Sequence, residues 1–356
     1  MVKYRVQTQA SLSSDESSKA STRLLANTWY EAVFDVPFES VDMRIHNMFH
    51  RFPRLRDWIK RSDFVRGILF FGWARRYPLV ATTTSMPGTR TFFLLERLFG
   101  RRRERLILLQ YMCGVPFRRR RDALWFRAVT RPALRKILRF AVVMTAWEPE
   151  HYARLLGLEA ERFFFVPWPQ AASAEVPAPA APRPFPPSVI ATGRVACDWE
   201  TLFAAAEGTD WPLKVICTPQ DLPLVRRLNR NRRAEVLCDI PAAEHHAQLC
   251  AASVFALCVF EKNKSIGHIR IRDAIAAGLP IVASGVRGVD GYLAHEENAL
   301  LVPPGDPKAL RGAIEKLLAD PVRRETLARN AFERARPLTQ ENTVRRINDL
   351  VRRAVE

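Results

Sequence analysis

Residues 265–284 read SIGHIRIRDAIAAGLPIVAS, and they indicate both a fold and a site. Helix-forming sequence follows Gly267, the triplet Gly278-Leu279-Pro280 closes it, and the apolar run PIVAS comes next. A helix that ends at a glycine and leads into an apolar run is typical of a parallel sheet with crossover helices. Unpaired N–H groups at the helix start would form an anion site, and a glycine there lets a phosphate approach.

The same alternation of apolar runs and helical patterns continues on both sides of this stretch, and it predicts two open parallel sheets. Residues 1–75 are the exception, and we expect them to form an irregular start to the first domain. The apolar runs lie at 77–84, 105–112, 140–146 and 162–168 in the first half, and at 188–193, 213–218, 234–240, 253–260, 280–284 and 299–304 in the second.

A proline-rich and alanine-rich segment, residues 171–187, cannot build a core and is interpreted as a linker. We therefore predict an α/β fold of two doubly wound parallel-sheet domains that face a cleft. The domains would be 1–170 and 188–340, with a C-terminal helix at 341–356 that could pack back on the first domain. Asp306-Pro307 and Asp320-Pro321 each predict a helix start, because aspartate caps and proline fits the first helical position.

The formal net charge of +18 is concentrated in the first domain. Residues 1–170 hold 30 Lys and Arg against 15 Asp and Glu, which leaves 25 against 22 for the rest of the chain. No RNA-recognition signature, KH loop, zinc finger or clear helix-turn-helix is found, so nucleic acid is not expected as a partner. Basic and aromatic residues flank apolar ones in RFPRLRDWIKRSDFVRGILFFGWARR (51–76), which suits either an anionic membrane surface or a solvated basic face.

The cysteines predict a cytoplasmic location, because they lie mostly inside apolar runs and form no C-x-x-C pair. The first 30 residues lack the apolar core of a signal peptide, and no apolar run is long enough to span a membrane. We therefore expect a cytoplasmic protein, with the inner face of the membrane as one possible place. The cysteines are Cys113, Cys197, Cys217, Cys238, Cys250 and Cys258.

Asp273 points away from the apolar face of the predicted helix, which Ile271 and Ile275 define. A carboxylate there could accept hydrogen bonds from both hydroxyls of a ribose while the helix start holds a diphosphate. The alternative is a surface ion pair between Asp273 and Arg270. Ser265 could cap the helix or bond the same phosphate.

The segment DAIAAGLPIVAS, with GVRGVDGYLAHEENALLVPPGDPKALRGAIEKLLADP after it, resembles the C-terminal half of GT-B glycosyltransferases, in particular the retaining family 4-like, or group 1, members. Those proteins carry an E-A-M-A-x-G-x-P-V-V-A-T segment and then G-L-L-V-P-P-G-D-P. The resemblance is specific from Val189 to about Arg336. AVVMTAWEPEHYARLLGLEAERFFFVPW, near the end of the first domain, looks like the last strand, helix and strand of the family's acceptor domain.

The resemblance implies a donor site made of eight residues. Asp273 matches the glutamate that binds the nucleotide ribose, and Arg194 matches the arginine that contacts the donor diphosphate. The remaining members match the loop at the base, the close-approach backbone around the phosphates and the position of the sugar-contacting glutamate. They are Asp239 and Ile240, then Gly193, Gly267 and His268, and finally Ser265.

The sequence departs from the family at two donor-side positions. Ser265 stands where many members have the glutamate that contacts the donor sugar, and the lysine that often follows the family arginine is missing after Arg194. On the acceptor side, the usual histidine is absent after the run that ends in Gln110 and Tyr111. Those two residues and the loop with Ser85 and Gly88 are the acceptor-side candidates.

We therefore expect a glycosyltransferase that moves a sugar from a nucleotide diphosphate to a lipid-linked glycan or a small molecule, with retention at the anomeric carbon. No Asp-x-Asp triplet occurs, so no metal is expected, and no cofactor beyond the nucleotide-sugar co-substrate. Neither a nucleophile nor another catalytic residue is assigned. The alternatives are an inactive scaffold with the same fold and, more remotely, a nucleic-acid binder. His46 and His50 have the i, i+4 spacing of a metal pair but lack the surrounding motif, which favours surface or packing roles.

Overall fold

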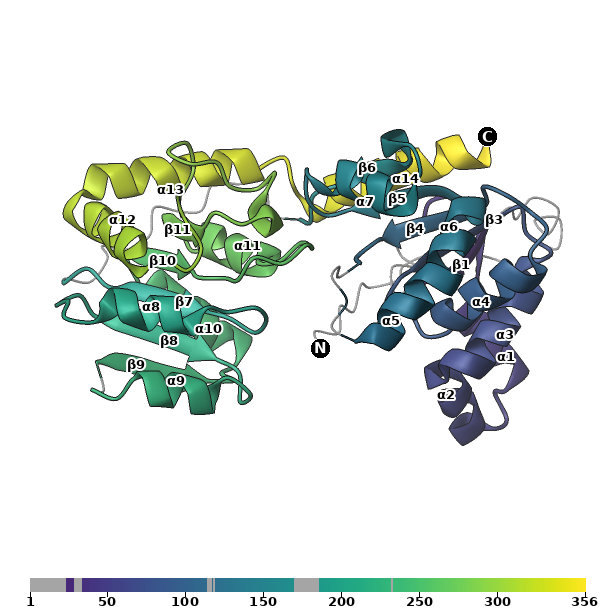
Figure 1. Cartoon of the computed structure of the whole chain (residues 1–356), viewed down its shortest axis with the longest axis horizontal. Coiled ribbons are helices and arrows are strands. Elements are labelled where there is room, and N and C mark those ends of the chain that lie inside the picture. Colours follow the sequence, from purple (N-terminus) through teal and green to yellow (C-terminus); the bar gives the residue numbers. More distant parts are fainter. Residues whose placement is uncertain (1–23, 29–33, 114–116, 118, 170–185, 232) are drawn as a thin grey trace.

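The computed structural model describes residues 24–28, 34–113, 117, 119–169, 186–231 and 233–356 (Figure 1). Within these ranges the chain forms two six-stranded sheets in which neighbouring strands run parallel. Each sheet lies between two hydrophobic clusters, so its central strands are buried on both faces. This arrangement confirms the predicted α/β fold of two doubly wound domains.

The first sheet has the order β2-β1-β3-β4-β5-β6. Its strands are β1 (Leu24–Asn27), β2 (Phe38–Ser40), β3 (Leu79–Thr83), β4 (Leu106–Gln110), β5 (Leu138–Val143) and β6 (Phe163–Phe165). Its helices are α1 (Val41–Met48), α2 (Pro53–Arg61), α3 (Asp63–Ala74), α4 (Thr89–Phe99), α5 (Arg120–Trp125), α6 (Arg131–Ile137) and α7 (Glu148–Leu156), with a π-helical turn at Phe126–Thr130 and a 3-10 turn at Ala160–Arg162.

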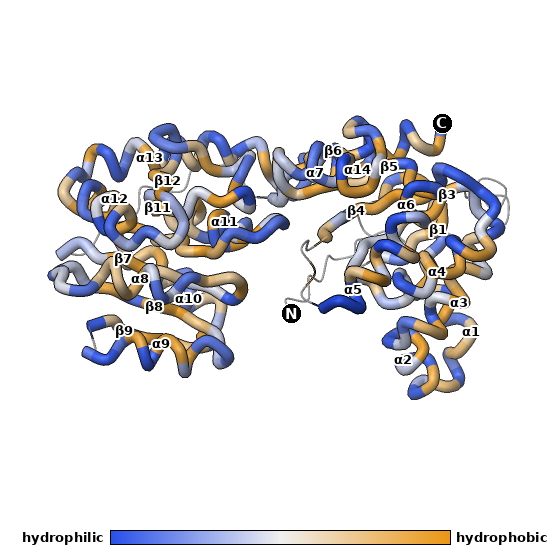
Figure 2. The backbone as a smooth tube through the Cα atoms, in the orientation of Figure 1, coloured by the Kyte–Doolittle hydropathy of each residue, from blue (hydrophilic) through white to orange (hydrophobic). Residues whose placement is uncertain are grey.

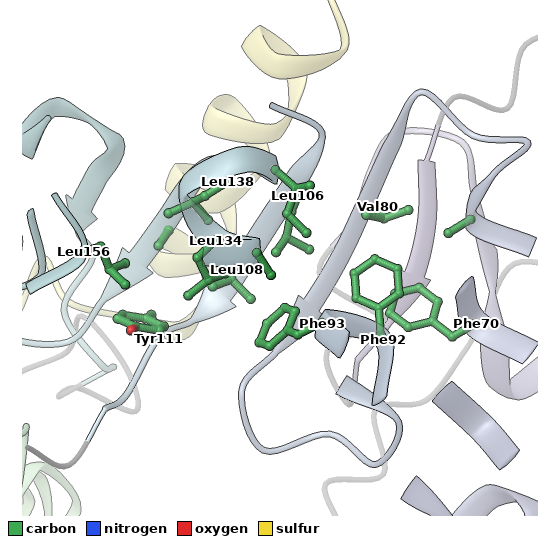
Figure 3. Close-up of a cluster of buried hydrophobic side chains, with 14 of the residues drawn as sticks. Phe70, Val80, Phe92, Phe93, Leu106, Leu108, Tyr111, Leu134, Leu138 and Leu156 are labelled. Carbon is green, nitrogen blue, oxygen red and sulfur yellow. The ribbon is translucent and has the colours of Figure 1, made fainter. Parts of the chain in front are cut away.

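The core of this domain forms because successive strand residues point to opposite faces of the sheet. On one face, Leu106 and Leu108 of β4 pack against Leu134 of α6, as Figure 3 shows. In the same cluster the rings of Phe70 and Phe92 stack at 4.3 Å between centroids and join α3 to α4. These contacts fix the helices that flank the carboxyl ends of β3 and β4.

The expectation of an irregular start at residues 1–75 was wrong for much of that segment, which holds β1, β2 and α1 to α3. The two strands have four and three residues, too few to show a period of two. In α2, Ile59 is the only buried residue, so the helix lacks the pattern of a core helix.

The second sheet has the order β12-β11-β10-β7-β8-β9. Its strands are β7 (Val189–Thr192), β8 (Leu213–Cys217), β9 (Ala234–Cys238), β10 (Val254–Leu257), β11 (Ile281–Ser284) and β12 (Leu300–Val302). Its helices are α8 (Trp199–Ala206), α9 (Leu222–Leu228), α10 (Ala242–Cys250), α11 (His268–Ala276), α12 (Pro307–Ala319) and α13 (Pro321–Ala335), with a 3-10 turn at Arg287–Val289.

Both Asp-Pro pairs start a helix, as predicted. The Asp306 side chain accepts hydrogen bonds from the backbone N–H groups of Lys308 and Ala309 at the start of α12. Asp320 accepts one from Arg323 at the start of α13. The predicted linker, residues 171–187, lies outside the described residues except for Pro186 and Pro187.

The two domains meet through loops at the carboxyl ends of β5 and β6. The Tyr292 hydroxyl donates to the carbonyl of Met144 at 2.6 Å and accepts from the N–H of Trp168 at 2.9 Å. The guanidinium of Arg287 lies 5.5 Å from the ring centroid of Trp147. The second domain therefore docks on the edge of the first sheet at which parallel strands place functional loops.

The last helix, α14 (Gln340–Val355), returns from the second domain and lies along the first (Figure 1). Its Ile347 and Val351 pack in one cluster with Leu24 and Leu79 of the first sheet. The Asn348 side-chain oxygen accepts a hydrogen bond from the N–H of Asp35 at 3.2 Å. The two ends of the described chain therefore stabilise the same domain.

Substitution of Val351 by alanine tests this packing. Val351 is fully buried, and the lost methyl groups are expected to lower the free energy of unfolding by about 1–3 kcal/mol. Urea denaturation provides the measurement, and Arg353→Ala, an exposed position on the same helix, is the control. Equal stability of both variants would mean that α14 does not pack on the sheet.

Candidate functional site

The sheet order of the second domain predicts where a ligand binds. β7 lies beside β10, and from this pair the chain order runs outward to β9 on one side and to β12 on the other. Ligands of open parallel sheets bind at such a switch point, outside the carboxyl ends of the two central strands. The loop after β7 carries Gly193 and Arg194, and the segment after β10 leads to α11.

Gly193 lies in a space that admits no side chain. A Cβ atom there would lie 2.1 Å from the sulfur of Cys197 and 2.8 Å from a guanidinium nitrogen of Arg270. Its N–H donates to the carbonyl of Ile216 at 3.0 Å, which aligns the loop with β8. Only glycine therefore fits at this position, where the chain packs closely on Cys197 and Arg270 at the carboxyl edge of the sheet.

Arg194 and Asp239 approach each other from the loops after β7 and β9. Their side chains are 3.8 Å apart and 74% and 64% exposed, so the pair is weak and can rearrange around a ligand. Asp239 has a φ of 50°, which turns the chain sharply after β9, and Ile240 packs against a core cluster beside it.

The start of α11 matches the predicted anion site in its backbone geometry. Gly267 is the N-cap, with a φ of 88°, and no side chain caps the helix. By contrast, the N–H of Gly88 at the start of α4 donates to the Asp63 carboxylate at 2.8 Å. At α11 no side-chain hydrogen bond caps the first N–H groups, as an anion site requires.

Ser265 does not cap α11, which corrects one of its two expected roles. Its hydroxyl lies 3.7 Å from the sulfur of Met112, and its N–H donates to Glu148 at 3.2 Å. Ser265 is 8% exposed. The position that resembles a family glutamate therefore faces the first domain.

Glu148, which the sequence did not single out, is fully buried where the domains meet. Its carboxylate accepts hydrogen bonds from the backbone N–H groups of Met144 at 2.8 Å and Thr145 at 3.0 Å, from Ser265, and from the Tyr152 hydroxyl at 3.2 Å. Burial raises the pKa of Glu148, and the hydrogen bonds oppose that rise. A carboxylate from the first domain thus holds the backbone just before α11.

His268 is a neutral, packed histidine in this arrangement. Its ring stacks on Tyr292 at 4.4 Å between centroids, and its Nε2 lies 3.1 Å from the carbonyl of Gly288. Burial lowers the pKa of His268 to about 4. The ring therefore supports the helix start without adding a positive charge at neutral pH.

Asp273 pairs with Arg272 and not with Arg270, so the expected alternative named the wrong partner. The nitrogens of Arg272 lie 2.9 and 3.1 Å from one carboxylate oxygen of Asp273. Burial lowers the pKa of His245, while Asp273 raises it and Arg194 lowers it. Both site residues therefore lie close enough to His245, on α10, to influence its charge.

Arg270 is the main residue that the sequence interpretation missed at this site. Its guanidinium donates to the carbonyls of Thr192 and Val195 at 3.3 and 3.2 Å and lies 3.5 Å from the sulfur of Cys197. None of these partners carries a carboxylate. Burial lowers its pKa, and its guanidinium lies directly behind the Gly193 loop.

The acceptor-side candidates come from the ends of β3 and β4. Gly88 has a φ of 87°, and a Cβ there would lie 2.9 Å from the backbone nitrogen of Gly67. Tyr111 is 1% exposed, and its ring packs edge-on against Tyr152 at 4.6 Å. The surroundings of Gly88 and Tyr111 therefore favour a packing role over contact with an acceptor. Ser85 is exposed and Gln110 half-buried, and their contact with an acceptor stays a prediction.

His46 and His50 are both exposed near the end of α1, and His50 Nδ1 bonds the carbonyl of Asn47 at 3.0 Å. Within the described part of the chain, no group of three or more His, Cys, Asp or Glu side chains could hold a metal ion. A cavity of about 590 Å³ lined by arginines such as Arg127 and Arg131 lies on the first domain and includes none of the predicted site residues.

A family model matches most of the second domain. Residues 186–320 match the family described as Glycosyl transferases group 1. The D-inositol 3-phosphate glycosyltransferase of Nocardioides sp. is 33% identical over 111 residues, which cover 31% of this chain and 24% of that protein. The lipopolysaccharide core biosynthesis glycosyltransferase LpsD of Rhizobium meliloti is 37% identical over 89 residues. The matches thus span about a quarter of these relatives, 24% and 26%.

Solved structures show the fold of the whole chain. Sucrose-phosphate synthase from Thermosynechococcus elongatus has a TM-score of 0.63 at 23% identity and covers 82% of this chain and 78% of its own. Anabaena Alr3699/HepE, solved in complex with UDP, has a TM-score of 0.64 at 14% identity and covers 94% and 99%. The chain therefore has the two-domain GT-B fold. Residues 186–320, in its second domain, are similar to the group 1 glycosyltransferases.

The buried guanidinium of Arg270 can be tested by substitution. Arg270→Met leaves the carbonyls of Thr192 and Val195 without their donor, and we expect unfolding to become easier by about 1–3 kcal/mol. Arg270→Lys, which can still reach one carbonyl, should recover part of the loss. Arg226→Met on the exposed surface of α9 is the control in urea denaturation. A wild-type midpoint for Arg270→Met would exclude the proposed support of the loop.

His268 predicts a pH-dependent stability. Because its pKa falls from 6.5 to about 4 on folding, the unfolded chain binds a proton between these values that the folded chain does not. The contribution of the neutral His268 to the free energy of unfolding is present above pH 6.5 and is lost as the pH falls toward 4. His268→Gln should flatten the thermal stability profile in this window by about 1–3 kcal/mol. Parallel profiles for the two proteins would contradict the assignment.

Proposed function

We propose that the protein is a glycosyltransferase that takes a sugar from a nucleotide-diphosphate donor bound to the second domain. The observation that supports this most directly is that the uncapped start of α11 and the exposed Arg194 both follow the central strands at the switch point of the sheet. A diphosphate needs N–H donors and positive charge, and the helix start and Arg194 would supply both at this edge of the sheet.

Each donor-side residue has a role in this proposal. The first N–H groups of α11 and the Arg194 guanidinium bind the diphosphate and stabilise the negative charge that develops on it as the sugar leaves. The Asp273 carboxylate accepts hydrogen bonds from the ribose, and the turn at Asp239 and Ile240 contacts the base. Arg270 supplies a second positive charge from behind the loop, where the sequence lacks the family's usual lysine.

These groups suit a reaction that needs no metal, because the arginine and the helix start neutralise the leaving group themselves. Retention at the anomeric carbon is proposed from the resemblance to the retaining members of the family. The acceptor is held by the first domain and is either a lipid-linked glycan or a small molecule. The six cysteines are all free thiols, which supports a cytoplasmic location.

An inactive scaffold of the same fold is the second candidate, and Ser265 favours it. Serine has no carboxylate that could contact a donor sugar, and the N–H of Ser265 is bonded to the buried Glu148. Such a protein would bind the nucleotide and transfer nothing. Donor binding and sugar transfer must therefore be measured separately.

Calorimetric titration with nucleoside diphosphates and their glucose conjugates tests donor binding, with UDP and UDP-glucose first because Anabaena Alr3699/HepE was solved with both. Arg194→Ala and Asp273→Asn should each weaken binding by about tenfold or more, since each removes a charged hydrogen-bonding partner. Arg226→Ala, an exposed arginine of α9, should bind as the wild type does.

Release of the nucleoside diphosphate, followed with and without a chelator, then separates the two candidates. The enzyme should turn over equally with the chelator present, and Asp273→Asn should lower turnover at limiting donor. Donor binding without hydrolysis or transfer to a panel of lipid and sugar acceptors would favour the scaffold. Failure of every nucleotide to bind would overturn the site itself.

A further inference from the structure

The α1–α3 face of the first domain exposes large apolar side chains at helical spacing. On α2 and its N-cap, Phe52, Leu55 and Trp58 follow one another at intervals of three and are 62%, 43% and 57% exposed. On α3, Phe64 and Ile68 are four residues apart and 66% and 43% exposed. Residues three or four apart share one side of a helix, so each helix presents an apolar stripe.

This face is where such side chains concentrate. Of the fifteen exposed large apolar residues in the described ranges, seven lie between residues 43 and 68, since Met43 and Met48 of α1 add to the five on α2 and α3. α2 contacts both α1 and α3, so the seven belong to one compact part of the domain. Figure 2 shows hydrophobic and hydrophilic stretches interleaved there. Scattered single residues would need no explanation, whereas a cluster does.

Positive charge surrounds the same side chains. Residues 43–68 contain seven Lys and Arg and two acids, and three of the cations, Arg44, Lys60 and the buried Arg66, pair with Glu39 and Asp42 just before this range. Arg56 bonds the Asp57 carboxylate at 3.0 Å, and Asp63 is used by the start of α4. Arg51, Arg54 and Arg61 are exposed and form no salt bridge within the described part of the chain.

We propose that this face is a membrane-contact surface that lays α2 in the interfacial layer of an anionic bilayer. Aromatic and aliphatic side chains between arginines match a lipid surface, in which acyl chains lie beneath negatively charged headgroups. The helices of the described chain include none that is long and apolar enough to cross a membrane, so the contact is peripheral. The inference needs no assumption about the donor, because the face shares no residue with the donor site.

The position of the face fits this role. In Figure 1, α2 lies at the end of the first domain that is remote from the second domain. Contact through α2 would therefore leave the second domain, with its nucleotide site, in water. A nucleotide donor and a membrane-bound acceptor could then reach the protein from different sides.

Sedimentation of the full chain with vesicles tests the surface. Vesicles of phosphatidylcholine mixed with phosphatidylglycerol should bind the protein, and phosphatidylcholine alone should bind it at least about tenfold less. The triple variant Leu55→Ser, Trp58→Ser, Phe64→Ser should lose about tenfold or more of the binding to anionic vesicles. Leu124→Ser with Val322→Ser, which removes exposed apolar side chains elsewhere, should bind as the wild type does.

Further variants separate the effect of charge on vesicle binding from an effect of the substitutions on folding. Arg51→Gln, Arg54→Gln, Arg61→Gln should weaken binding and reduce its sensitivity to salt, and all variants should keep the wild-type melting temperature because these side chains are exposed. Wild-type binding by the apolar variant would overturn the proposal. So would self-association of the wild type that the same variant abolishes, because the face would then be covered by a second copy. Neither result would affect nucleotide binding or sugar transfer, and these two measurements test the proposed function independently.

Discussion

One buried carboxylate connects the backbones of both domains. Glu148 accepts N–H groups from Met144 and Thr145 at the end of β5 and from Ser265 just before α11. A carboxylate removed from water is tolerated only when its oxygens are hydrogen-bonded, and the Ser265 N–H supplies one of these bonds from the second domain. The start of α11 is therefore held against the first domain, and the position of the proposed diphosphate site relative to the acceptor side depends on this contact.

The second domain concentrates several functions on one short helix. α11 begins after Gly267 without a side-chain cap, directs Arg270 toward the loop after β7, and carries Asp273 one turn further on. The sheet order makes this possible, because β10 and β7 are neighbours and their following segments meet at one edge. If the two central strands were not neighbours, these groups would lie apart. The candidate site therefore depends on the order of the strands in the sheet.

The fold could be predicted from the sequence because its signals are local. Apolar runs, the Asp-Pro helix starts and Gly267 each report the conformation of a few residues, and the structure has them where they were expected. The helices α1 to α3 were missed because α2 buries only Ile59 and so shows no core-facing pattern. Arg270 was misjudged because spacing along a helix does not reveal that a side chain points into a neighbouring loop.

The sequence by itself determined the alternation of strands and helices, the helix start at Gly267 and the basic excess of the first domain, because these follow from residue type and spacing. The tertiary structure alone decided which side chains meet. It placed Glu148 at Ser265, buried Tyr111 against Tyr152 and brought Arg194 within 3.8 Å of Asp239. These contacts join residues distant in the chain, and their geometry depends on how strands order within a sheet and on how the domains dock.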